Sequence, residues 1–366
     1  MKGANLGKVN KHHQKHKPMR KFYITLLACA VGISAWALEP EEGIYKLATP
    51  QDLVDFATLV NQGETAANAQ LTADIDMSEV TDFTGIGVAR DILFTGTFDG
   101  QGHKISGLNI NLPEKEEVGL FHIAGGAVLK NFSLDETCTI TGSKNVGLVG
   151  WCNAASGATF EKVGTAAKMV GGENTSAFIG RGWSSSAPMS FTDCWTVGEI
   201  ENTSGTTGNW IGWCSNWKAE FTNCWTISTF AIAPADGNYL TRKGDNVTFT
   251  NCYTLRGSQG IKMTEDDVTS GALCYNLNGD QSMITWYQTL GVDPYPVLDS
   301  SHGIVIRNQD GTYANETAID VVHSPQTQMS NGVYDLFGRR IADRIPADAD
   351  LPKGIYIVGG RKVMVK

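Results

Sequence analysis

The sequence lacks both the proline content of a disordered linker and the Gly-X-Y period of collagen. It has only 11 prolines among 366 residues but 41 glycines, well above the usual ~7%. This composition predicts a folded, turn-rich protein. A chain of this length is expected to form two or three structural units, with ample material for a hydrophobic core.

Long apolar runs are missing after residue 37, which predicts no transmembrane helix in the mature chain. The whole chain has 29 basic and 38 acidic residues. The first 37 residues hold seven of the basic residues and no acidic ones, so the remainder has a net charge of −16. A body this acidic repels phosphate backbones, which disfavours nucleic acid as a partner.

The N-terminus has the pattern of an export signal. A basic leader is followed by an uncharged apolar run that is too short to span a bilayer comfortably, and this run ends in Ala35, a tryptophan and Ala37. Small residues at these two positions are typical of a signal cleavage site, so residues 1–37 are interpreted as a signal peptide. A start at Met19 and a lipoprotein reading through Cys29 are alternatives.

The predicted mature chain has seven cysteines, and they form neither a Cys-x-x-Cys pair nor a cluster with histidine. This spacing gives no indication of zinc, and we expect neither a metal site nor a cofactor. An odd number leaves at least one free thiol. The seven are Cys138, Cys152, Cys194, Cys214, Cys224, Cys252 and Cys274.

Internal repetition is the strongest signal in the chain. A unit of about 30 residues contains a small residue, a hydrophobic pair and glycine, followed by a strand that begins with an aromatic residue. About five units lie between residues 93 and 262. The first part recurs at 147–150, 177–180, 209–212 and 238–241, and the second at 160–163, 191–194, 221–224 and 249–252.

These units predict an all-β fold, a parallel β-helix-like β-solenoid. They combine short β-branched and aromatic runs with Gly and Asn turns, show no helical period and are too short for propeller blades. In a solenoid each coil pairs with the next, so equivalent residues stack in columns along the axis. Cys194, Cys224 and Cys252 are then expected to form a buried column, with disulfides as the alternative.

A second column is expected from the residues that precede those cysteines, namely Asp193, Asn223 and Asn251. Short polar side chains of this kind commonly satisfy the backbone groups of turns. We therefore predict a structural role at the turns for this column.

Both ends of the repeats carry predicted caps. Thr49 and Pro50 begin a short amphipathic helix within an N-terminal cap over residues 38–92, which precedes the solenoid at 93–262. A C-terminal cap and linker is expected over residues 263–319. Three short strands then predict a small C-terminal β module at 320–366.

The repeats resemble the GLUG motif, named for its Gly-Leu-hydrophobic-Gly core. The segment 94–108 is similar to the one that commonly precedes such repeats, and the resemblance covers residues 44–262. It implies a β-helical surface or adhesin-like protein of Gram-negative bacteria, especially Bacteroidetes.

The C-terminal module resembles the sorting domain of Bacteroidetes type IX secretion. The matching residues are Tyr334, Gly338, Arg339, Gly354, Tyr356 and the final basic strand. The resemblance implies a small β-sandwich that engages the outer-membrane secretion machinery. A purely structural terminal module is the alternative.

Four aromatic residues are candidates for ligand binding: Trp195, Trp225, Tyr253 and Trp213. The first three each follow a column cysteine, so strand alternation places them on the opposite face, outward if the cysteines point inward. Such a stripe is able to stack on sugars or on a protein partner. Alternatively, the rings stack on one another or lie beneath a turn or cap.

Catalytic residues are not identified. Arg181, Arg242 and Lys243 occupy neighbouring repeat positions where they could face Asp193, but no group of acidic residues recurs beside them. A β-helix polysaccharide lyase or hydrolase requires either paired carboxylates or a metal–carboxylate site with a basic residue nearby.

The sequence thus favours an exported protein of the extracellular space or outer cell surface. The leading hypothesis is a non-enzymatic adhesin that binds a glycan or protein ligand. A polysaccharide-degrading enzyme and a passive envelope scaffold are the alternatives.

Overall fold

The computed structural model describes residues 38–316, apart from 154–156, 184–186, 215–217 and 245, and four short stretches near the C-terminus, 333–335, 339–342, 353–358 and 361–365. The predicted signal peptide with Ala35 and Ala37 lies outside the described residues, as does Gly338. Among the described residues, no helix is long and apolar enough to span a bilayer.

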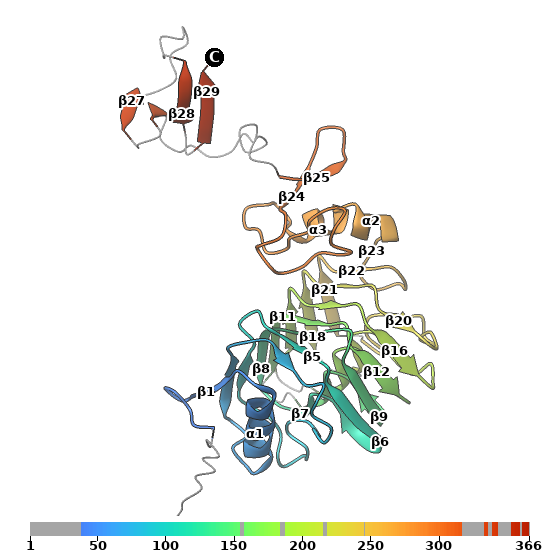
Figure 1. Cartoon of the computed structure of the whole chain (residues 1–366). Coiled ribbons are helices and arrows are strands. Elements are labelled where there is room, and N and C mark those ends of the chain that lie inside the picture. Colours follow the sequence, from blue (N-terminus) through green and yellow to red (C-terminus); the bar gives the residue numbers. More distant parts are fainter. Residues whose placement is uncertain are drawn as a thin grey trace, which may run out of the picture. The chain divides into compact units, whose positions relative to one another are not determined.

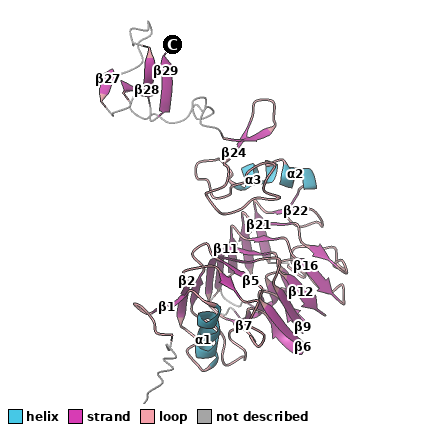
Figure 2. Ribbon diagram, in the orientation of Figure 1, coloured by secondary structure: helices cyan, strands magenta, loops and turns pink. Residues whose placement is uncertain are grey.

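The repeats form a parallel β-solenoid of about six coils, which confirms the predicted fold class (Figures 1 and 2). Every ladder among β1 to β23 is parallel, and three sheets form its walls. Wall 1 has fourteen strands. They are β1 (Ile44–Leu47), β2 (Asn68–Leu71), β3 (Ile75–Asp76), β4 (Thr97–Asp99), β5 (Lys104–Ser106), β8 (Val128–Leu134), β11 (Ala158–Thr165), β14 (Met189–Thr192), β15 (Trp195–Thr196), β18 (Ala219–Thr222), β19 (Trp225–Thr226), β21 (Val247–Thr250), β22 (Tyr253–Thr254) and β23 (Ile261–Lys262).

The other two walls are shorter. Wall 2 consists of β7 (Phe121–Ala124), β10 (Val149–Asn153), β13 (Ile179–Trp183) and β17 (Ile211–Trp213). Wall 3 consists of β6 (Asn109–Val118), β9 (Thr139–Val146), β12 (Lys168–Gly171), β16 (Glu199–Asn202) and β20 (Thr229–Phe230).

Equivalent residues of successive units stack in register, as the repeats predict. Phe160, Phe191, Phe221 and Phe249 are paired partners along wall 1. The first three rings stack with centroids 4.4 and 4.2 Å apart, and all three are buried. The expected cysteine column is present, and all seven described cysteines are buried free thiols. The disulfide alternative is therefore wrong for them.

The Asp/Asn column forms a bend of wall 1 in which successive coils adopt the left-handed backbone conformation. Asn131, Lys162, Asp193, Asn223 and Asn251 have φ between 52° and 56°. Asn and Asp tolerate this conformation better than other L-residues, which explains their recurrence. Their side chains also bond along the column, since Nδ2 of Asn251 donates to Oδ1 of Asn223 at 2.9 Å. The Asp/Asn column therefore has the structural role at the turns that the sequence predicts. This role depends mainly on the left-handed backbone conformation of the column residues.

The last glycine of the repeat is required by close packing between coils. A Cβ atom on Gly150, Gly180 or Gly212 would lie 2.3 to 2.5 Å from backbone atoms of Glu117, Asn145 or Asn174 respectively. These three residues also have positive φ, so they form a second column of bends. No residue of the next bend, 203–207, has a positive φ, and the repeat there has Thr241 in place of glycine.

The N-terminal cap has the predicted helix, α1 (Pro50–Asn61). Thr49 is its N-cap and forms a reciprocal capping box with Asp52. Its apolar face buries Phe56, whose ring meets those of Phe94 and Phe98 at 6.1 and 6.3 Å. The helix therefore covers core side chains of the first coils, and so protects them from water.

The C-terminal cap contains α2 (Glu265–Thr269), α3 (Ala272–Leu277) and the antiparallel hairpin β24 (Val305–Arg307) and β25 (Tyr313–Asn315). Its apolar residues form a cluster separate from the solenoid core, together with Trp225 and Tyr253. We expected this region only to close the open end of the solenoid. Instead, it also packs against the outer face of wall 1.

The C-terminal module is a four-stranded antiparallel sheet in the order β27-β26-β28-β29. Its strands are β26 (Val333–Tyr334), β27 (Arg340–Ala342), β28 (Gly354–Val358) and β29 (Arg361–Val365). The sequence predicted three strands here. The first of these is divided into β26 and β27, which pair antiparallel, and the backbone N–H of Asp335 donates to the carbonyl of Arg339.

Candidate ligand-binding face

Three of the four aromatic candidates lie beneath the C-terminal cap. Trp195, Trp225 and Tyr253 pair in register across β15, β19 and β22, as predicted. However, Trp225 is fully buried and Tyr253 is 8% exposed. The cap residues Trp286 and Tyr295 meet the Trp225 ring at 6.2 and 5.6 Å. An exposed stripe is therefore wrong for Trp225 and Tyr253, and the alternative of stacked rings beneath a cap is confirmed.

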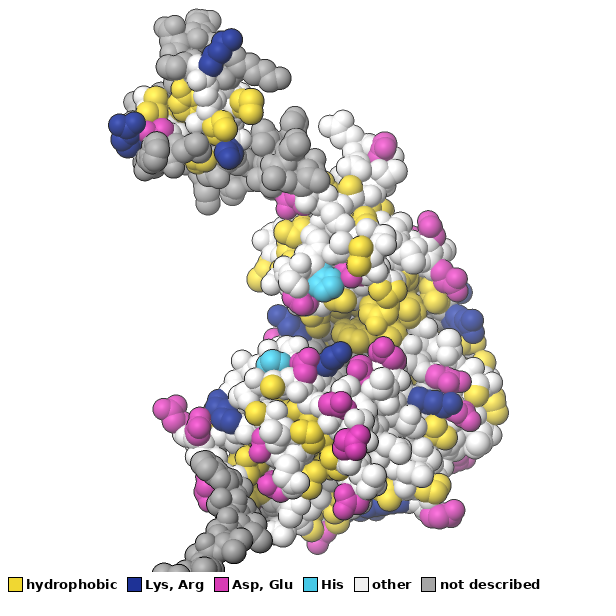
Figure 3. Space-filling model, viewed as in Figure 1, with side chains coloured by type: hydrophobic (Ala, Val, Ile, Leu, Met, Phe, Trp, Pro, Cys, Tyr) yellow, Lys and Arg dark blue, Asp and Glu magenta, His cyan; other side chains and the backbone are white. Residues whose placement is uncertain are grey.

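Trp195 is half-buried and lines a groove of about 670 Å³. On the solenoid side His103, Asn131 and Lys162 also line it, and the cap contributes residues 297–300. Figure 3 shows a hollow between the solenoid and the cap in which hydrophobic side chains gather, with charged side chains at its rim. His103 is held by Asp74, whose Oδ1 lies 3.0 Å from Nδ1.

Asp193 does not meet the basic residues that the sequence placed near it. It is buried, which raises the pKa of its carboxyl, and it accepts a hydrogen bond from Nε1 of Trp286 at 3.3 Å. The charged groups that act on it are Lys162 and Glu161. Arg181, Arg242 and Lys243 therefore do not face Asp193, a position that the sequence left open to them. Arg181 lies on wall 2, and the bridge between Ile211 and Thr241 continues that wall toward Arg242 and Lys243.

Trp213, the fourth candidate, lies on the outer face of wall 2 in a column of alternating aromatic and basic residues. Trp151 pairs with Arg181, and Arg181 pairs with Trp213. The bridge between Ile211 and Thr241 continues the same register, which brings Lys243 beside Trp213. We call Trp151, Arg181, Trp213 and Lys243 the tryptophan–cation ladder.

Basic groups lie over both indole rings of this ladder. The guanidinium carbon of Arg242 lies 4.6 Å from the Trp213 ring centroid, and Nζ of Lys243 lies at 5.1 Å. Arg90 covers Trp151 at 4.6 Å. Both tryptophans are half-buried, whereas Arg181 and Lys243 are exposed. The cation–π contacts hold the indole planes of Trp151 and Trp213 in place. The charged ends of Arg181 and Lys243 remain at the surface.

The ladder is a local excess of positive charge on an acidic protein. Arg90 is neutralised by Glu117 at 2.7 Å, and Arg242 donates to Oδ1 of Asn174 at 3.2 Å. Within the part of the chain that the structure describes, Arg181, Arg242 and Lys243 form no ion pair. These cations remain available to an external hydrogen-bond acceptor.

The aligned repeats of the sequence already indicate this column. The residue directly after the last glycine of each unit is Trp151, Arg181 or Trp213, and Arg242 follows Thr241. Their common position in the repeat places Trp151, Arg181 and Trp213 on one outward column. The fourth place belongs to Lys243 and not to Arg242, because the bridge between Ile211 and Thr241 shifts the register by one residue relative to the sequence repeat.

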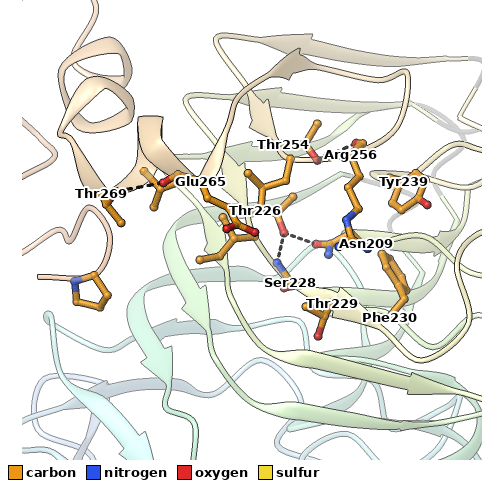
Figure 4. Close-up of a pocket in the computed structure, with 14 residues that line it drawn as sticks. Asn209, Thr226, Ser228, Thr229, Phe230, Tyr239, Thr254, Arg256, Glu265 and Thr269 are labelled. Atoms are coloured by element: carbon orange, nitrogen blue, oxygen red, sulfur yellow. Dashed lines mark hydrogen bonds between the residues drawn. The ribbon is translucent and has the colours of Figure 1, made fainter.

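A smaller pocket of about 270 Å³ lies where wall 3 ends (Figure 4). Among its lining residues are Asn209, Thr226, Ser228, Phe230, Tyr239, Thr254, Arg256, Glu265 and Thr269. None of these residues was a candidate from the sequence. No group of three or more metal-binding side chains occurs among the residues described.

These observations define the class of protein as a parallel β-solenoid with capped ends. No family model matches the sequence. The chain is 34% identical over 140 residues to a halomucin of Haloquadratum walsbyi, a match that covers 35% of this chain and spans only 2% of the length of the halomucin. The structure of this chain is similar to that of a candidate immunoglobulin A1 protease from Bacteroides ovatus. The two have 12% sequence identity and a TM-score of 0.48, and the match covers 71% of this chain and 93% of the other.

Proposed function

We propose that this chain is an exported, non-enzymatic binding protein of the cell surface or extracellular space, and that it binds a glycan through the tryptophan–cation ladder. The observation that carries the proposal is the in-register column of Trp151, Arg181, Trp213 and Lys243. Indole faces stack on the apolar faces of sugar rings, and guanidinium groups donate hydrogen bonds to hydroxyl or carboxylate oxygens.

The periodicity of the ladder favours a glycan chain over a globular protein. Parallel strands lie ~4.8 Å apart, so the two tryptophans recur at about 10 Å with Arg181 between them. A surface that repeats along one axis is complementary to a ligand that also repeats. The export part of the proposal is supported by the leader and by the resemblances to GLUG repeats and to a sorting domain.

A glycan array probed with the full mature chain tests this function. We expect saturable binding to at least one polysaccharide, and a loss of about tenfold or more in affinity for Trp213→Ala and for Arg181→Met, since aromatic and charge-assisted contacts are each worth over ~1 kcal/mol. Lys144→Met on wall 3 is the matched control, because the Lys144 side chain is 42% exposed and is paired with Glu116. Its binding is expected to match the wild type.

Binding that survives both ladder variants would refute this use of the ladder. Binding to matrix proteins alone would favour a protein ligand. Release of sugar fragments from a bound polysaccharide would favour the enzyme instead.

We also propose that residues 320–366 act as a type IX sorting module. In support, Arg339 is anchored to Asp335, with Nε donating to Oδ2 at 2.7 Å, and Tyr356 is buried within the sheet. Removal of residues 320–366 in a bacterium that has this secretion system is expected to leave the protein in the periplasm. Normal appearance of the truncated protein outside the cell would refute the sorting role.

A further inference from the structure

The pocket in Figure 4 reaches a polar part of the otherwise apolar solenoid interior, because the walls of the solenoid end at different coils. Wall 3 ends at β20, whereas wall 1 continues to β22 and β23. Asn209, Thr226 and Thr254 are therefore reached from the pocket although they are only 2 to 3% exposed. The pocket combines a polar floor with a volume of about 270 Å³, near the lower end of the usual range for small-molecule sites.

The floor presents hydrogen-bonding groups in fixed orientations. Oδ1 of Asn209 accepts from the hydroxyls of Thr196 and Thr226 at 2.8 and 3.0 Å. These bonds occupy the oxygen of the amide, and its Nδ2 group has no protein partner among the described residues. Oγ of Ser228 is buried and likewise lacks a partner within that part of the chain. The sequence departs from its repeat at this point, because the small residue of the earlier units is Asn209 here.

The sides of the pocket differ in charge. Figure 4 shows Arg256 near Tyr239, Phe230 and Asn209, while Glu265 lies with Thr269 at the other side. Neither Arg256 nor Glu265 forms an ion pair with another described residue, although both line the same pocket. Phe230 and Tyr239 form an edge-to-face pair at 5.8 Å, which supplies a rigid apolar wall.

We propose that this pocket binds one acidic monosaccharide unit of the uronic or sialic acid class. The carboxylate of the sugar pairs with the guanidinium of Arg256, a geometry for which the planar fork of arginine is suited. Sugar hydroxyls donate to the carboxylate of Glu265 and accept from Nδ2 of Asn209. The apolar face of the ring packs against Phe230 and Tyr239.

The pocket is independent of the tryptophan–cation ladder, since the two share no residue. A ligand without hydroxyl groups leaves Glu265 unpaired, and a ligand without a carboxylate leaves Arg256 unpaired. An acidic sugar satisfies both groups, and this is why we assign that ligand class.

Isothermal titration calorimetry on the full mature chain tests the proposal, with glucuronic acid, glucose and glycine as probes. We expect glucuronic acid to bind at least tenfold more tightly than glucose or glycine. Arg256→Met is expected to weaken glucuronic acid binding about tenfold or more, because a charge-assisted bond is lost. Glu265→Gln is expected to have a smaller effect, since an amide oxygen still accepts a hydrogen bond.

Two controls separate the outcomes. Lys262→Met removes an exposed cation of β23 that does not line the pocket, and Trp213→Ala alters the ladder. Both are expected to bind glucuronic acid as the wild type does, and circular dichroism checks that every variant is folded. No glucuronic acid binding by the wild type, equal binding of glucose, or full binding by Arg256→Met would overturn the proposal. Loss of binding in Trp213→Ala alone would assign the acidic sugar to the ladder.

Discussion

Replacement of Trp225 by alanine distinguishes a structural role from a ligand-binding one. The indole is fully buried and contacts the rings of Trp195, Trp286 and Tyr295 at 6.1, 6.2 and 5.6 Å. Burial of about 200 Å² of aromatic surface at about 25 cal/mol per Å² corresponds to about 5 kcal/mol. Measured losses for such truncations are about 3–5 kcal/mol, so we expect a loss of about 4 kcal/mol of unfolding free energy.

Urea unfolding of the full mature chain, followed by circular dichroism, measures this change. Trp225→Phe keeps an aromatic ring and is expected to lose only about 1–2 kcal/mol. Trp183→Ala is the control, since Trp183 is 41% exposed, and it is expected to change stability by about 0.5 kcal/mol or less. A loss below about 1 kcal/mol for Trp225→Ala, together with loss of ligand binding, would refute the structural role.

Three further predictions concern single residues of the solenoid. Burial lowers the pKa of His122 to about 3, so between pH 6.5 and pH 3 only the unfolded chain takes up its proton. This group should therefore lower the free energy of unfolding by about 1.4 kcal/mol for each pH unit that the pH drops in this range. His122→Phe should reduce the slope of unfolding free energy against pH, and an unchanged slope would contradict the lowered pKa of His122. Lys162→Asn should raise the thermal midpoint, because φ is 53° and relief of left-handed strain is worth about 1 kcal/mol; a lower midpoint would contradict this. Gly180→Ala should lose about 1–3 kcal/mol in urea unfolding, since its Cβ would lie 2.3 Å from the carbonyl carbon of Asn145; unchanged stability would show that the coils separate freely.

The fold was predictable because each coil repeats the same local chemistry. In a solenoid a repeat in sequence becomes a column in space, so the stacks of phenylalanine and cysteine followed directly from the spacing of Phe191, Phe221, Cys194 and Cys224. The helix α1 was predictable for a different reason. Its capping box at Thr49 and its apolar face depend only on residues within one turn of one another.

The binding surfaces were less predictable, because they depend on which segment covers each wall. Strand alternation placed Trp225 on the outer face correctly, but the residue that covers it, Trp286, is 61 positions later in the chain. The pocket at Asn209 likewise arises from strands of wall 3 that end earlier than those of wall 1, and α2 completes it from the cap.

The sequence by itself determined the coil, its stacked columns and the N-terminal helix, since these follow from short-range periodicity and from pairing between adjacent repeats. Only the tertiary structure decided which outward columns stay accessible. Trp225 and Trp213 occupy comparable outward positions on different walls, yet the cap buries the first and leaves the second beside Arg242 and Lys243. The physical reason is that burial depends on contacts between segments far apart in the chain, and no local pattern encodes which of two apolar faces such a segment will cover.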